Sequence, residues 1–103
     1  MDVFEAIERR YSVRSYKPDP VEDEKLSRVL EAARQAPTAN NQQPFRILVV
    51  HTRGREEELQ RVYGRRWLTQ APLLIGFVAL PGEAWRRMDG KPYGEDDAAI
   101  AMD

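Results

Sequence analysis

The spacing of apolar residues along the chain predicts short helices separated by extended segments. Near the start, Asp2 is a candidate N-cap. The apolar side chains after it, Val3, Ala6 and Ile7, recur at the spacing of one helix face. Residues 11–16 are rich in β-branched and aromatic types and are predicted to be extended. A second amphipathic helix is predicted over residues 22–35, and Pro37 ends it.

The second half of the chain contains two apolar strands and further helical stretches. Residues 45–50 are predicted to form a strand, and residues 72–80 are continuously apolar, as expected of a central strand covered on both faces. Between them a helix is predicted after Gly54, with three side chains facing inward (Leu59, Val62 and Tyr63). A last helix begins with the acidic residues 95–97 and continues with apolar side chains at helical spacing (Ala98, Ala101 and Met102).

The chain has 103 residues, enough for one small domain with a single core. The last helix becomes apolar at Ala98 and should be buried, and the strand at 72–80 needs neighbours on both edges. Few other elements are present to cover them. We therefore expect residues 1–103 to be one domain that forms the N-terminal portion of a longer protein, truncated at its C-terminus.

The composition, with 42% hydrophobic and 32% charged residues, is that of a globular protein. Sixteen basic and 17 acidic side chains leave a net charge of −1, so no bulk field favours nucleic acid or an anionic membrane. The absence of cysteine excludes a thiolate metal site and a cysteine nucleophile, and His51 alone cannot form a histidine metal site. No signal peptide and no membrane-spanning apolar run is visible, and a cytoplasmic location is expected.

Residues 10–14, Arg-Tyr-Ser-Val-Arg, are the first candidate binding motif. In an extended chain, the side chains of Arg10, Ser12 and Arg14 leave the backbone on the same side. Two guanidinium groups flanking a hydroxyl suit a phosphate together with a second planar acceptor. Taken alone, the motif is short enough to arise by chance, and Arg9 and Arg10 are also explained as cations in the last turn of a helix.

A second polar motif covers residues 36–45, Ala-Pro-Thr-Ala-Asn-Asn-Gln-Gln-Pro-Phe. Its four consecutive carboxamides, at residues 40–43, can each donate and accept hydrogen bonds. Such groups match the alternating donor and acceptor edge of a heterocyclic cofactor. Taken alone, the run is also explained as a solvated turn. The occurrence of both motifs, separated by one amphipathic helix, favours ligand binding.

Together the two motifs resemble the flavin-binding motifs of the nitroreductase family, from Met1 to about Val50. The resemblance implies an α+β fold with a central mixed sheet flanked by helices, built as an intertwined homodimer with FMN at the subunit interface. It implies that Arg10 and Ser12 bind the FMN phosphate beside the backbone of Tyr11, and that Arg14 approaches the pyrimidine and ribityl side. It also implies that the second motif contacts the flavin bound mainly by the partner subunit, through Pro37, Thr38, Ala39 and Asn41, with Gln43 supporting the loop.

The same resemblance implies an FMN-dependent oxidoreductase. It would take two electrons from NADH or NADPH and pass them by ping-pong to nitroaromatic, quinone or similar electron-poor acceptors. The flavin carries this chemistry, so no catalytic acid or base is expected, and Arg14 is expected to stabilise the reduced cofactor electrostatically. Two alternatives remain open: a flavin-binding or dimerisation module without turnover, and another branch of the family, such as a reductive dehalogenase or an enoyl-type reductase.

Other polar residues are weaker candidates. Arg66 and Trp67 lie where family members often place flavin contacts, but Trp67 is explained more simply as a core residue. Acidic residues are interleaved with four arginines, Arg53, Arg55, Arg86 and Arg87. A basic surface that binds nucleic-acid phosphates would not be neutralised in this way. Asp96 and Asp97 point in different directions on a helix, and we interpret them as its acidic start rather than as a metal-binding or acid–base pair.

Overall fold

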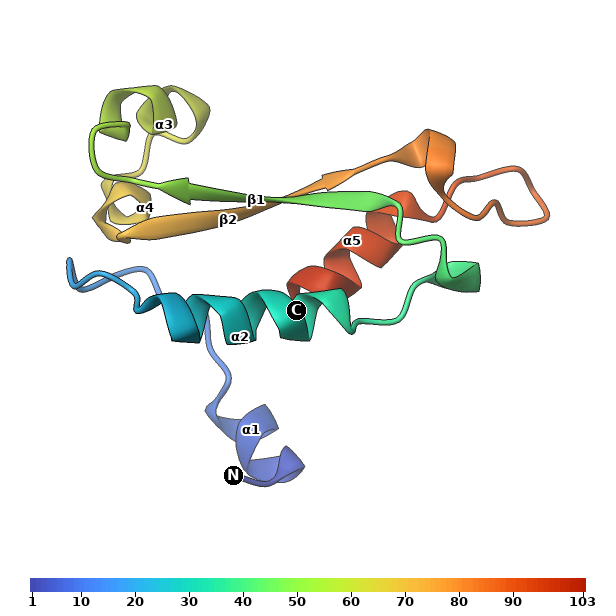
Figure 1. Ribbon diagram of the computed structural model, residues 1–103, viewed down its shortest axis with the longest axis horizontal. Helices are drawn as coiled ribbons and strands as arrows, with labels where there is room; N and C mark the ends of the chain where they lie inside the picture. Colours follow the sequence, from blue (N-terminus) through green and yellow to red (C-terminus); the bar gives the residue numbers. More distant parts are fainter.

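The computed structural model describes all residues from Met1 to Asp103 (Figure 1). It contains the helices α1 (Val3–Arg9), α2 (Asp23–Arg34), α3 (Glu56–Val62), α4 (Arg66–Gln70) and α5 (Gly94–Met102), and the strands β1 (Phe45–His51) and β2 (Leu73–Ala79). Short 3₁₀ turns lie at Ala39–Asn41 and Pro81–Glu83. The order of helices and strands predicted from the sequence is confirmed.

The two strands form one antiparallel sheet in which Phe45 lies opposite Ala79 and His51 lies opposite Leu73. Helices α2 and α5 lie on the same side of this sheet (Figure 1). Side chains of β2, including Ile75 and Phe77, line an apolar cavity of about 310 Å³ between the sheet and these two helices. The fold therefore has one layer of helices against one face of a two-stranded sheet.

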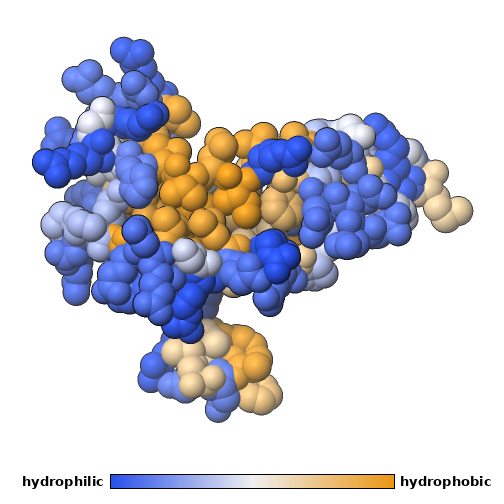
Figure 2. Space-filling model, in the orientation of Figure 1, coloured by the Kyte–Doolittle hydropathy of each residue, from blue (hydrophilic) through white to orange (hydrophobic).

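The opposite face of the sheet has no such cover. Leu48 of β1 and Val78 of β2 are 51% and 44% exposed, and because side chains alternate along a strand they point away from the helix-covered face. Figure 2 shows apolar atoms gathered between the two ends of the sheet. As the small number of elements in the chain leads one to expect, residues 72–80 are thus covered by helices on one face only. The helices and strands together form the predicted α+β arrangement. A mixed sheet is also predicted, but the two strands of this chain are antiparallel and no parallel strand pairs with them.

Small residues form the core. Eight of the 103 residues are buried, and the buried hydrophobic ones are all alanines (Ala33, Ala71, Ala98 and Ala101). Larger apolar side chains remain exposed on α1, which stands apart from the other elements (Figure 1), with Phe4 at 78% and Ile7 at 68%. Val62 is also 84% exposed, which corrects its predicted inward orientation, because α3 packs against α4 and not against a face of the sheet.

None of the helices combines the length and the apolar content needed to cross a bilayer.

Candidate functional site

Residues 10–16 form the first part of the connection between α1 and α2 and belong to neither a helix nor a strand. The backbone leaves α1 in an extended conformation at Arg10 (φ −63°, ψ 129°). The one side-chain hydrogen bond within this connection is donated by the Tyr16 hydroxyl to the carbonyl oxygen of Val13, at 2.9 Å. Ser12 and Arg14 border a common open depression of about 510 Å³, which Arg10 does not line. The structure therefore brings together two of the three residues predicted to face one way.

Aromatic side chains form the other wall of this depression. Trp67 lines it with Tyr63 and Leu68, and the ring centroids of Trp67 and Tyr63 are 5.6 Å apart in an edge-on arrangement. The ring of Tyr16 also packs against Trp67, at a centroid distance of 6.1 Å. Trp67 thus packs within an aromatic cluster and also lies beside Ser12 and Arg14, whereas Arg66 does not line the depression.

Within the second predicted motif, residues 36–43 form a loop with a tight turn after the C-terminal end of α2. Asn40, Asn41 and Gln43 have φ angles of 54°, 50° and 51°, in the left-handed region that asparagine enters more readily than most residues. The Thr38 carbonyl oxygen accepts a hydrogen bond from the Asn41 amide at 3.0 Å, and Thr38 Oγ1 accepts one from the Gln43 amide at 3.0 Å. Hydrogen bonds around Thr38 therefore stabilise an unusual backbone conformation.

The side-chain amides of this loop are free to bind a ligand. Asn41 and Gln43 are exposed, and none of the carboxamides at residues 40–43 takes part in the side-chain hydrogen bonds within the chain. Each carboxamide offers both a donor and an acceptor. The loop therefore combines a fixed backbone with uncommitted polar groups, which suits a heterocycle.

A carboxylate of α5 contacts this loop, and the sequence interpretation did not identify it. Asp97 is 1% exposed, and its Oδ1 accepts a hydrogen bond from the Ala39 backbone amide at 3.0 Å. Asp96 is exposed, so the acidic start of a helix accounts for Asp96 but not for Asp97. One feature of the sequence does indicate that Asp97 is buried. At helical spacing, Asp97 lies on the same face of α5 as the small residues Gly94, Ala98 and Ala101.

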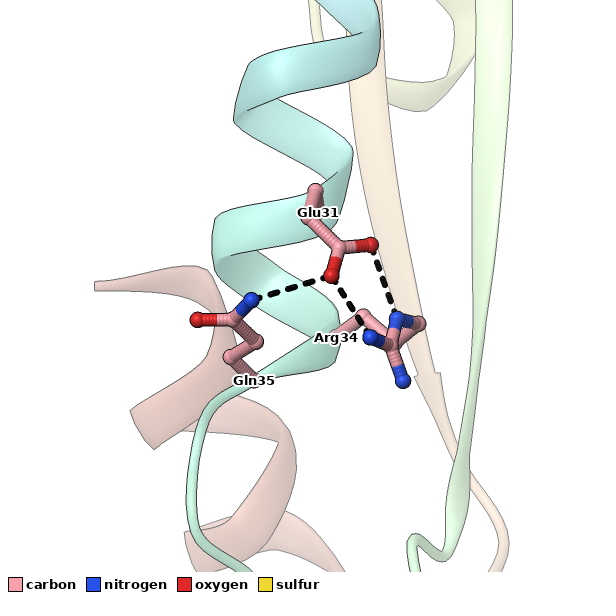
Figure 3. Close-up of polar contacts among 3 residues, drawn as sticks. All are labelled: Glu31, Arg34 and Gln35. Carbon is pink, nitrogen blue, oxygen red and sulfur yellow. Dashed lines mark hydrogen bonds and ion pairs between the residues drawn. The ribbon is translucent and has the colours of Figure 1, made fainter.

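The last turn of α2, directly before the loop, carries an exposed polar cluster (Figure 3). Arg34 donates from Nε and Nη2 to the two carboxylate oxygens of Glu31, at 2.8 and 2.6 Å, and Gln35 Nε2 donates to Glu31 Oε1 at 3.0 Å. The hydrogen bonds from Arg34, and then that from Gln35, lower the pKa of Glu31 to about 2. The same contact raises the pKa of Arg34 above its usual value. Because the pair is exposed, its contribution to stability is small.

The two predicted motifs are far apart in one chain. The loop at 36–43 follows the C-terminal end of α2, whereas the connection at 10–16 lies towards its other end and beside α4 (Figure 1). Helix α2 has 12 residues, which corresponds to a length of about 18 Å. One chain therefore does not form a single pocket from both motifs.

Comparison with known proteins settles the family. The sequence model of the Nitroreductase family matches residues 7–72, a range that contains both motifs. The chain belongs to the nitroreductase family. This confirms the resemblance based on the two motifs.

Individual relatives of this nitroreductase-family chain agree in sequence and in fold. It is 34% identical over 90 residues to the NADH dehydrogenase of Thermus thermophilus, covering 86% of this chain and 44% of that protein. It is 30% identical over 79 residues to the FMN reductase (NAD(P)H) of Bacillus subtilis, covering 76% and 32%. The crystal structure of a nitroreductase family protein from Clostridium difficile superposes with a TM-score of 0.82 at 35% identity, covering 98% of this chain and 58% of that one. The chain thus spans about half, or less, of the length of these relatives.

Proposed function

We propose that this chain is the N-terminal portion of an FMN-dependent NAD(P)H oxidoreductase. The observation that carries the proposal is that both binding motifs fall inside the nitroreductase-family match at residues 7–72. The names of two relatives, NADH dehydrogenase and FMN reductase (NAD(P)H), support this choice of cofactor and reductant. When bound, FMN supplies two-electron chemistry, taking hydride from NAD(P)H and passing the electrons by ping-pong to a nitroaromatic, a quinone or a similar electron-poor acceptor.

The polar groups of the two motifs fit such a cofactor. Arg10 and Arg14 form no ion pair within the chain, in contrast to Arg9, whose Nη2 lies 2.8 Å from Glu5 Oε1. Their guanidinium groups therefore remain available to an anion. We assign the FMN phosphate to Arg10 and Ser12, next to the backbone of Tyr11. Arg14 is assigned to the pyrimidine and ribityl side, where a cation stabilises the negative charge of the reduced flavin.

The flavin is proposed to lie between two copies of the protein. Two observations support a homodimer: the motifs lie at opposite ends of α2, and the apolar face of α1 and one face of the sheet are exposed. In this arrangement the flavin bound mainly by one copy contacts the 36–43 loop of the other, through Pro37, Thr38, Ala39 and Asn41, with Gln43 supporting the loop. A cytoplasmic location, where NAD(P)H is supplied, is part of the same proposal.

An absorption spectrum of the purified protein tests this function. We expect a yellow protein, as isolated or after reconstitution with FMN, that bleaches when NADH or NADPH is added without oxygen and regains its colour with a quinone. A yellow protein that never bleaches would instead support a flavin-binding module without turnover. A colourless protein that does not take up FMN would contradict the proposal.

A further inference from the structure

The side chain of Asp97 is buried without a cationic partner. Together with Pro44 it is one of the largest fully buried side chains in the chain. No lysine or arginine forms an ion pair with it, and its Oδ2 is buried without a hydrogen-bond donor from this chain. Burial of a carboxylate is unfavourable unless its hydrogen bonds compensate. The bond that Oδ1 accepts from the Ala39 amide is the one hydrogen bond that this side chain forms within the chain.

That hydrogen bond joins two parts of the chain 58 residues apart. The other hydrogen bond from a loop backbone amide to a side chain, from Gln43 to Thr38 Oγ1, lies within the loop itself. Asp97 is thus the only side chain outside the loop that forms a hydrogen bond with it, and α5 in turn packs against β2 and α2. Three left-handed residues, Asn40, Asn41 and Gln43, require such external support, because left-handed backbone at residues other than glycine persists only where its surroundings fix it.

We infer that Asp97 is a positioning residue that fixes the 3₁₀ turn at Ala39–Asn41 in the orientation in which the loop contacts the flavin, an inference that rests on the proposed function. The required property is the acceptor oxygen beside the Ala39 amide, not the negative charge. A loop fixed in advance loses less conformational freedom when the ligand binds, and this strengthens binding. Asp97 itself touches no ligand atom in this assignment.

Three variants of the purified protein separate this role from others. Asp97→Ala removes the acceptor, Asp97→Asn keeps an acceptor oxygen without the charge, and Asp96→Ala removes the same charge from the exposed neighbouring position. The FMN dissociation constant is measured by fluorescence quenching, and hydrogen exchange of the Ala39 amide is followed by NMR. We expect Asp97→Ala to weaken FMN binding roughly tenfold and to accelerate exchange at Ala39 by a similar factor. We expect Asp96→Ala and Asp97→Asn to leave both quantities within about threefold of the parent.

The outcomes distinguish this role from the proposed function. If the parent binds FMN and Asp97→Ala binds it equally tightly, with Ala39 still protected, the positioning role is wrong and the flavin function stands. If the parent does not bind FMN but Ala39 is deprotected in Asp97→Ala, the contact holds the loop as inferred and the flavin function fails. Should Asp97→Ala lose its helical circular dichroism, Asp97→Asn decides: parent-like FMN affinity supports the acceptor role, and a tenfold loss overturns it.

Discussion

The two regions proposed to bind flavin differ in how the chain shapes them. The loop at 36–43 is fixed by hydrogen bonds around Thr38 and by the buried carboxylate of Asp97. The connection at 10–16 has one local side-chain hydrogen bond, and its Tyr11 is 75% exposed. One region has its geometry before any ligand arrives, whereas the other has few interactions of its own.

This difference indicates how a substitution in each region should act. Removal of a side chain that forms hydrogen bonds within the chain should change both the loop conformation and ligand binding. A side chain without internal partners affects only the ligand, because its removal breaks no bond in the folded chain. The following predictions use this contrast, and the first has the largest expected effect.

Arg10→Ala should weaken FMN binding while leaving the free energy of unfolding of the FMN-free protein unchanged. A charge-assisted hydrogen bond to phosphate contributes roughly 1.5–3 kcal/mol, which corresponds to a loss of affinity of about 10- to 150-fold. The measurements are an FMN titration by fluorescence quenching and urea unfolding without FMN. Arg9→Ala is the matched control, since it removes the same charge from an adjacent position whose ion pair with Glu5 is exposed.

Equal FMN affinity of Arg10→Ala and the parent would contradict the phosphate assignment. A large loss of stability in the FMN-free Arg10→Ala protein would contradict the contrast itself, because it would show that residues 10–16 are fixed by interactions within the fold.

Arg14→Ala should retain FMN but lower its reduction potential, because a positive charge near the pyrimidine stabilises the reduced flavin. A tenfold change in the two-electron equilibrium corresponds to about 30 mV, and we expect a shift on that order. The potential is measured by equilibration with a reference dye, with Arg28→Ala, an exposed cation on α2, as the control. An unchanged potential with FMN fully bound would remove Arg14 from this role.

The sequence predicted the elements of the fold better than their surroundings. The apolar runs at 45–50 and 72–80 correctly indicated β1 and β2. Periodicity shows which side chains share a face, but not whether another element covers that face. For this reason the pattern predicts that Val62 faces inward, whereas the side chain of Val62 is exposed in the structure.

For the candidate site, local patterns identified the loop but not what fixes it. The run of carboxamides at residues 40–43 indicated a polar binding segment, and Asn40 and Asn41 adopt the left-handed conformation that asparagine tolerates. The contact between Asp97 and Ala39 joins residues 58 positions apart. No local pattern contains such a contact, and only the position of Asp97 within a stripe of small residues indicated that its side chain is buried.

Glu31→Gln tests the exposed cluster in the last turn of α2, directly before the loop, and should have the smallest effect. The pKa of Glu31 is lowered from 4.5 to about 2 in the folded chain by its hydrogen bonds with Arg34 and Gln35. Because the folded-state pKa is the lower one, the cluster stabilises the fold above about pH 4.5, and this contribution is lost as the pH falls towards 2. The parent should therefore be slightly more stable than Glu31→Gln at neutral pH, and the difference should disappear near pH 2.

Urea unfolding across this pH range measures the effect of Glu31→Gln, and Glu24→Gln, at an exposed position of the same helix without an ion pair, is the matched control. High salt should reduce the difference, since the pair is open to solvent. FMN affinity should not change, because the hydrogen bond inferred to fix the loop is the one that the Ala39 amide donates to the buried carboxylate of Asp97. If Glu31→Gln weakened FMN binding as strongly as Asp97→Ala, the exposed cluster at the end of α2 would also fix the loop. The difference between the loop and residues 10–16 would then not depend on the buried carboxylate alone.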